Sequence, residues 1–289
     1  MEIEPWIAKE YENIDELTWK ITLNDGVVFS NGRVCDGQAV KESLESLVEN
    51  HERAAGDLCI DSIEADGNVV TIKTTEPKPA LINYLSDPYG CIIDVQAGIT
   101  DNGIVIGTGP YVATDLVTDD HLTLVKNENY WNKDHIKIDE VEMVLVADST
   151  AELNAFNNGE IELIRLTAEQ YKRYEKDPRV NVFRNNSVWY LEYNMENKFL
   201  ANKKIRQALT LAVDKEEMAN TIVKGTGEAA YGIVPTGFPG ESKTFREENG
   251  DSYPKYNLEE AKRLYKEGLA ELGVTELPEL SLIINEAGN

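Results

Sequence analysis

The sequence of 289 residues has only three cysteines, an odd number with wide spacing: Cys35, Cys59 and Cys91. No Cys-x-x-Cys pair occurs, so neither a zinc knuckle nor a disulfide framework is indicated. A free cysteine behaves as a small apolar side chain. We therefore expect the three thiols to be buried, and the sequence leaves their chemical state open.

Residues that carry catalysis are also scarce. The three histidines, His51, His121 and His135, lack the spacing of metal ligands. No Gly-x-Ser-x-Gly nucleophile elbow occurs, and carboxylates are so frequent that some pair by chance. We therefore expect no catalytic residue, no metal site and no cofactor.

Neither a long apolar run nor a basic surplus is present. No stretch approaches the ~20 apolar residues of a membrane span. The acidic start, residues 1–6, lacks the apolar core of a signal peptide, so the chain is either cytosolic or has lost a leader. Lys and Arg number 28 against 52 Asp and Glu, a net charge of −24. This charge argues against nucleic acid as a partner and against direct docking on an anionic membrane.

Hydrophobic residues make up 42% of the chain, enough for a core in one large domain or two smaller ones. Alternating or short apolar runs predict strands, and Asp66-Gly67 predicts a hairpin. The expected strands are 19–23, 62–65, 69–73, 111–113, 121–125, 141–146, 161–164, 188–194 and 280–284. Capping residues predict helices that begin near Asp36, Ser149, Thr167, Asn202, Asp214 and Asn257.

The glycine-rich run Gly107-Thr108-Gly109 invites comparison with a phosphate-binding loop. A dinucleotide loop needs a third glycine, and Val112 stands in that place. Pro110 removes a backbone N–H that would hold phosphate, and a strand follows instead of a helix. The sequence therefore predicts a tight turn that opens a strand.

Several segments, in order, resemble the family 5 solute-binding proteins, which are the peptide- and nickel-binding proteins of ABC importers. The matching segments include Gly107-Thr108-Gly109-Pro110-Tyr111 and the later run that ends in Tyr130-Trp131. The others are 4–9, 17–32, 158–162 and 204–215. The resemblance implies an α/β fold of the type II periplasmic-binding-protein class, in which two lobes close on a ligand.

The same resemblance implies a domain layout. Residues 1–107 would form a subdomain of the first lobe and 108–194 its remainder up to a hinge at Tyr193 and Asn194. Residues 195–289 would begin the second lobe. Because family members are much longer, we expect the first lobe to be largely present and the second lobe to be truncated.

Ligand residues follow from the resemblance as well. In nickel-binding relatives an arginine follows the first long helix, a tryptophan comes three residues later, and a second arginine follows a proline. Arg53 matches the first position, Gly56 replaces the tryptophan, and Tyr89 after Pro88 stands where the second arginine would be. We expect Arg53 and Tyr89 to contact ligand. The alternative is an exposed Arg53 at a helix end near its C-terminal carbonyls.

The implied function is that of an extracytoplasmic, non-enzymatic substrate-binding component of an ABC importer. Its ligand would be a small peptide or a nickel or other metal chelate, and its partners the permease subunits. The protein would lie in the periplasm or at the outer face of the membrane on a lipid anchor. The alternatives are a sensor or chaperone-like module without a permease and, less favoured, a hydrolase.

Overall fold

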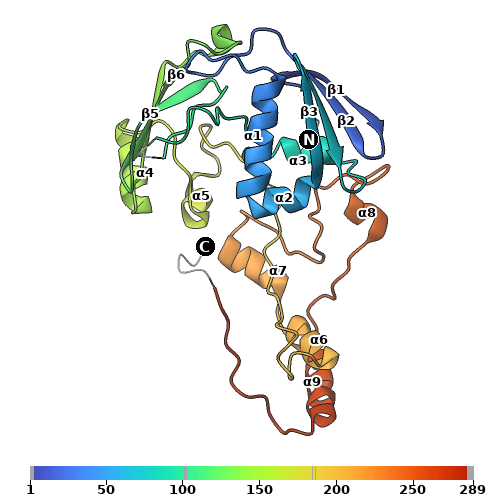
Figure 1. Ribbon diagram of the computed structural model, residues 1–289. Helices are drawn as coiled ribbons and strands as arrows, with labels where there is room; N and C mark the ends of the chain where they lie inside the picture. The colour runs from blue at the N-terminus through green and yellow to red at the C-terminus, as the bar shows by residue number, and fades with distance from the viewer. Residues whose placement is uncertain (1–2, 101–102, 184, 186, 285–289) are drawn as a thin grey trace. The chain divides into compact units, whose positions relative to one another are not determined.

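The computed structural model describes residues 3–100, 103–183, 185 and 187–284 (Figure 1). The chain divides into two compact units, Met1–Ala147 and Asp148–Asn289, and each is described by itself. The lobe boundaries expected at residues 107 and 194 stay predictions.

The first unit contains a four-stranded antiparallel sheet with the order β1-β2-β4-β3. Its strands are β1 (Ala8–Asp15), β2 (Thr18–Leu23), β3 (Ile60–Asp66) and β4 (Val69–Thr74). The hairpin predicted at Asp66-Gly67 joins β3 to β4, and Gly67 takes a φ of 56° there. Glycine adopts this left-handed conformation without the cost that a side chain would add.

Helix α1 (Gly37–Asn50) covers one face of this sheet (Figure 1). Asp36 begins the helix as predicted, because its carboxylate accepts a hydrogen bond of 3.0 Å from the Ala39 N–H. The apolar face of α1 meets the inward side chains of the strands in one core, which includes Val40, Leu44, Ile63, Val70 and Ile72. Each large apolar side chain buried in this way contributes about 2 kcal/mol to folding.

The first unit also holds a three-stranded antiparallel sheet with the order β5-β6-β7. Its strands are β5 (Tyr111–Val117), β6 (His121–Lys126) and β7 (Glu140–Val144), which confirms the three strands predicted for this region. Short helices complete the unit: α2 (Glu52–Leu58), α3 (Leu81–Leu85), η1 (Pro88–Gly90) and η2 (Lys133–His135).

The glycine turn before β5 is structural, as predicted. Asn127 is only 2% exposed, and its side-chain amide donates a hydrogen bond of 2.8 Å to the Gly109 carbonyl. Its side-chain oxygen accepts one of 3.0 Å from the Asn129 N–H. The Gly107 carbonyl accepts a further bond from the backbone of Ser30. The turn is therefore held to two other parts of the unit.

The second unit is built mainly from helices. They are α4 (Ser149–Asn158), α5 (Ala168–Tyr174), α6 (Lys203–Leu211), α7 (Lys215–Met218), the π-helix η3 (Ala219–Val223), α8 (Phe245–Asn249) and α9 (Leu258–Leu272). Capping side chains precede most of them as the sequence predicts, among them Thr167, Asn202, Asp214 and Asn257; Asp148 caps α4, one residue before the expected start.

Helices α6 and α9 pack closely against each other. Their shared apolar cluster contains Ala208, Leu211, Ala261 and Leu264. A Cβ atom at Gly268 of α9 would lie 2.7 Å from the Ile205 side chain of α6, which is closer than atoms can approach. Glycine at this position therefore permits the close contact. Helix α6 packs with the later part of the chain, as its position after residue 194 predicts.

Three expected strands are absent from the structure. Residues 161–164, 188–194 and 280–284 carry apolar side chains but lie outside regular secondary structure, and Leu163, Trp189 and Ile283 are strongly exposed. A strand needs a neighbour for its backbone N–H and C=O groups. Within the described residues no strand pairs with these segments.

The expected burial of the cysteines is correct for Cys35 and wrong for the other two. Cys35 lies in the core, and burial raises the pKa of its thiol to about 12. Cys59 is half-buried and ends α2 in a left-handed conformation, with a φ of 47°. Cys91 follows η1 and is exposed.

The helices of the described part of the chain are all too short or too polar to cross a membrane.

Replacing Asn127 by Ala tests the role of the turn. The Gly109 carbonyl and the Asn129 N–H would lose their partners, so we expect the free energy of unfolding to fall by about 2 kcal/mol. Urea unfolding measures this change. Asn132→Ala is the control, since the Asn132 side chain caps no helix; its effect should stay within about 0.5 kcal/mol. Equal effects of the two variants would contradict the proposed role.

Candidate functional site

Arg53 lies in the first turn of α2, which follows α1 after a single residue. His51 ends α1 and begins α2, and its Nδ1 atom accepts a hydrogen bond of 3.1 Å from the Ala54 N–H. Arg53 is exposed, as the alternative expected, but it lies in the first turn of a second helix; its contact with ligand stays a prediction. The sequence did not reveal the second helix because histidine is an uncommon N-cap.

The structure brings Arg53 and Tyr89 together, although they come from α2 and η1. The Arg53 guanidinium lies over the Tyr89 ring, 5.5 Å from its centroid. Two carboxylates join the pair. Asp57 lies 3.3 Å from Arg53 Nε, and Asp87 lies 3.6 Å from Arg53 Nη2. We call Arg53, Asp57, Asp87 and Tyr89 the Arg53 cluster.

Tyr89 acts as a hydrogen-bond donor in the Arg53 cluster. Its hydroxyl donates a bond of 3.2 Å to Asp57 Oδ2. Partial burial, followed by this bond to a carboxylate, raises the pKa of Tyr89 to about 12. The phenol therefore keeps its proton at neutral pH, and its ring offers a flat face to the Arg53 cation.

The charges of the Arg53 cluster do not balance. Two carboxylates face one guanidinium, so the formal charge is −1, and the Arg53 side chain is 67% exposed. A Cβ atom at Gly56, on the same helix, would meet nothing within 4 Å, so the surface there is open. The arrangement can accept a positively charged or hydrogen-bond-donating group. A negatively charged group would have to displace the aspartates from Arg53.

The two aspartates were not identified from the sequence. Asp57 follows Arg53 by four residues, a spacing that favours an ion pair on one helix face. That signal was available once α2 was recognised. Asp87 caps η1 just before Pro88, and its approach to Arg53 depends on the tertiary fold.

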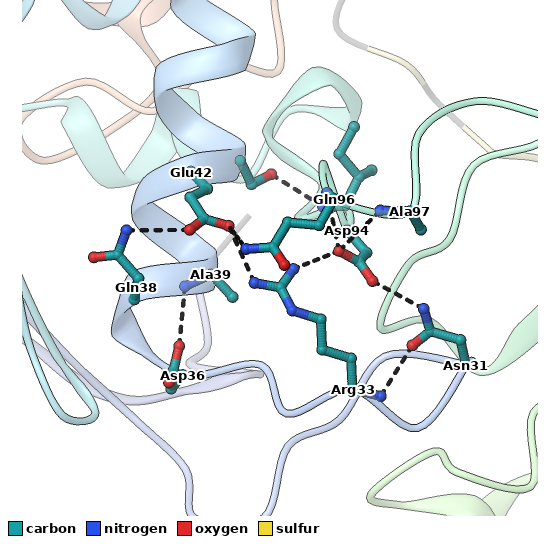
Figure 2. A network of polar contacts seen from close by, with 11 residues as sticks. Asn31, Arg33, Asp36, Gln38, Ala39, Glu42, Asp94, Gln96 and Ala97 are labelled. Carbon is teal, nitrogen blue, oxygen red and sulfur yellow. Dashed lines mark hydrogen bonds and ion pairs between the residues drawn. The ribbon is translucent and has the colours of Figure 1, made fainter.

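A second polar network lies beside α1, and Figure 2 shows it from close by. Asp94, only 3% exposed, forms an ion pair with Arg33 and accepts a bond of 2.8 Å from Asn31. Arg33 also contacts Glu42 of α1 at 3.1 Å, and Gln96 donates to the same Glu42 carboxylate at 3.0 Å. The network joins two loops to the helix.

Asp94 remains ionised inside this network. Burial of the carboxyl opposes ionisation, but hydrogen bonds from Asn31 and Arg33 outweigh it and lower the pKa of Asp94. Because Asp94 is buried and pairs with Arg33 and Asn31, the network holds the loops in place.

The predicted hinge residues lie ahead of α6. The Tyr193 hydroxyl is 3.2 Å from Thr210 Oγ1, and Asn194 Oδ1 accepts a bond of 2.9 Å from the Glu196 N–H. Tyr193 therefore contacts α6. The role of Tyr193 and Asn194 as a hinge stays a prediction.

Within the described residues no group of three or more His, Cys, Asp or Glu side chains is placed to hold a metal ion. The Arg53 cluster has two carboxylates, and both contact the Arg53 guanidinium.

Comparison with known proteins shows where the chain belongs. A family model described as bacterial extracellular solute-binding proteins, family 5 Middle, matches residues 2–288. The chain belongs to this family. The membership confirms the resemblance read from the sequence. It also confirms the α/β fold of the type II periplasmic-binding-protein class, which the solved structures share.

Relatives in this family differ in the solutes that their names state. The dipeptide-binding protein DppE of Bacillus subtilis is 31% identical over 75% of this chain and 41% of its own length. The nickel-binding protein NikA of Staphylococcus aureus is 28% identical over 79% of this chain and 47% of its own length. The chain thus spans about half the length of these curated relatives.

Two solved structures of family members show the same fold. NikA from Staphylococcus aureus in complex with Ni(L-His)2 has a TM-score of 0.77 and 27% identity, covering 94% of this chain and 56% of that one. Listeria monocytogenes OppA bound to peptide has a TM-score of 0.78 and 25% identity, covering 94% and 60%.

Replacing Asp94 by Asn tests the buried network. Arg33 would lose an ionised partner, and since 27% of its side chain is exposed we expect a moderate loss of about 2 kcal/mol in unfolding free energy at pH 7. A lowered pKa stabilises the fold above the ordinary value of 3.8 and stops doing so as the pH falls through the lowered value.

The difference between wild type and Asp94→Asn should therefore be constant near neutrality and shrink as the pH falls below 3.8. Urea unfolding at several pH values measures it. Asp61→Asn, at an exposed position on β3, is the control. A difference that persists unchanged at acid pH would show that the Asp94 charge contributes nothing.

Proposed function

We propose that this chain is part of the extracytoplasmic substrate-binding component of an ABC importer for peptides or a nickel or other metal chelate. The observation that carries the proposal is the Arg53 cluster. It unites Arg53 and Tyr89, the two positions expected to contact ligand, on an open surface of a family 5 fold. The relatives named for dipeptides and nickel support the two solute classes.

The mode of binding follows from a two-lobed fold. The solute is held between the lobes, and contacts to both lobes favour the closed state over the open one. Arg53 and Tyr89 supply contacts from the first lobe, while Tyr193 and Asn194 form the hinge. The closed form then delivers the solute to the permease subunits.

The charge of the Arg53 cluster favours one solute class over the other. With a formal charge of −1, it attracts a solute that presents a positive group and repels an anionic chelate. Peptides with an exposed ammonium or lysine side chain fit this condition. We therefore favour peptides, with a cationic metal chelate as the second candidate.

The protein acts outside the cytoplasm, in the periplasm or on a lipid anchor at the outer face of the membrane. It is a binding protein and not an enzyme. A sensor or chaperone-like module with the same site, but without a permease, is the alternative; a stable complex with a receptor in place of permease subunits would favour it.

The decisive experiment uses the full-length protein. Mass spectrometry of the molecule that co-purifies identifies the solute, and calorimetry measures its affinity. We expect Asp57→Asn to weaken binding of a cationic solute about tenfold, because it removes one of the two carboxylates that attract the positive group. Arg165→Ala, which removes an exposed arginine without a contact in the Arg53 cluster, should leave the affinity unchanged.

Two results would contradict the proposal. One is a full-length protein that binds neither peptides nor chelates. The other is hydrolytic turnover in a broad activity screen that is lost when a single residue of the Arg53 cluster is replaced.

A further inference from the structure

His121 begins β6 directly after the tight turn that joins this strand to β5. Both nitrogens of its ring face a carboxylate. Nδ1 lies 2.8 Å from Asp120 Oδ2, and Nε2 lies 3.3 Å from Asp115 Oδ2. Asp120 belongs to the turn and Asp115 to β5, so the imidazole links the turn to the neighbouring strand. We call His121, Asp115 and Asp120 the His121 clamp.

The pairing of the strands brings Asp115 within reach of the ring. Asp115 pairs with Thr123, two residues along β6 from His121, so Asp115 and His121 are diagonal neighbours on one face of the sheet. The register between the two strands shifts just before Asp115, and such irregularities redirect side chains. The clamp is therefore a product of the hairpin geometry.

The turn that carries Asp120 is held by few contacts. Asp119 has a φ of 61°, which is uncommon for a residue with a side chain. The Asp120 N–H donates a hydrogen bond of 3.1 Å to the Val117 carbonyl. The Asp120 carbonyl accepts one of 2.8 Å from the Leu145 N–H, directly after β7. The position of Asp120 therefore matters for the hairpin tip and for the end of β7.

The His121 clamp is complete only with a charged ring. An ionised carboxylate can only accept hydrogen bonds, whereas a neutral imidazole has one N–H and one lone pair. The imidazolium form alone donates to Asp115 and Asp120 at the same time. In the neutral form one carboxylate would face a lone pair, and that contact would open. The number of bonds that hold the tip therefore depends on a single proton.

The other charges around His121 are negative. Asp119 lies in the turn, and Glu142 and Glu140 of β7 pair with residues of β6 on the same face as His121. Lys126 of β6 lies on the opposite face. Strands β5 and β7 and the turn contain no lysine or arginine. The surroundings of the ring therefore favour its protonated form.

The contacts of the clamp raise the pKa of His121 above its ordinary value of 6.5, with the bond to Asp120 as the largest cause and the bond to Asp115 as the next. A raised pKa means that the folded hairpin binds the proton more tightly than the unfolded chain does. The stabilisation is therefore complete below pH 6.5 and is lost as the pH rises through the raised value.

We propose that the His121 clamp is a pH-sensitive switch of the β5–β6 hairpin. With a protonated ring the clamp holds the hairpin tip closed. Loss of the proton releases the tip, together with the bond between Asp120 and Leu145 at the end of β7. The switch lies within the first unit, and it depends neither on the Arg53 cluster nor on the importer role.

Nuclear magnetic resonance of labelled histidine in the full-length protein, from about pH 5 to about pH 9, tests the charge of the ring. Loss of a signal in His121→Asn identifies the His121 resonance. We expect its midpoint to lie above that of the same protein unfolded in urea. Asp115→Asn and Asp120→Asn should each move the midpoint to lower pH, because each removes one acceptor of the clamp.

The matched control is Asp119→Asn. It removes a carboxylate of the same turn that makes no hydrogen bond or ion pair with a described residue. Asparagine tolerates the left-handed backbone at this position, so the turn keeps its shape. At physiological ionic strength, which screens charges that are not in contact, this variant should shift the midpoint least of the three.

Hydrogen exchange measures the conformational effect of the proton. After correction for the intrinsic pH dependence of exchange, the amides of Asp120 and Leu145 should exchange about threefold faster above the His121 midpoint than below it. His121→Asn has no titrating side chain at this position. It should therefore exchange at the faster rate across the whole pH range.

Three results would overturn the proposal. The first is a His121 midpoint no higher than that of the unfolded protein. The second is a shift in Asp119→Asn as large as those in Asp115→Asn and Asp120→Asn, which would assign the effect to the diffuse charge of the turn. The third is a raised midpoint with exchange at Asp120 and Leu145 that does not change with pH, which would show an ion pair without a switch.

Discussion

Burial of the apolar face of α1 against the sheet β1-β2-β4-β3 is the constraint on which the first unit depends. In sequence, helix α1 lies between β2 and β3, and β4 pairs with both of these strands. The helix can cover the sheet only when Val40 and Leu44 face the strands. The position of α1 then fixes the segments at its two ends. The loop with Arg33 lies before the helix, and α2 with Arg53 follows it.

The two polar groupings that α1 positions have opposite physical character. The Asp94 carboxylate is buried and pairs with the partly exposed Arg33, so the loss of a partner is costly for Asp94. Around Arg53 the side chains are exposed and the carboxylates outnumber the cation, so the pairs exchange with solvent at little cost.

The chain is strongly acidic, with a net charge of −24. The Arg53 cluster has the same sign, with a formal charge of −1. Relatives of this chain are named for dipeptides, nickel and glutathione, so proteins of this family differ in the solutes that their names state.

The sequence by itself determined the elements whose signals are local: the Asp66-Gly67 hairpin, the caps at Asp36 and Asn257, and the turn before β5. It also determined the family, through several short segments in order. Tertiary structure alone decided what depends on distant partners. Apolar runs such as 188–194 are not strands without a paired neighbour, and Asp87 reaches Arg53 only because η1 lies beside α2. Side-chain periodicity reports which face is apolar, but pairing and charge balance arise only when separate segments meet.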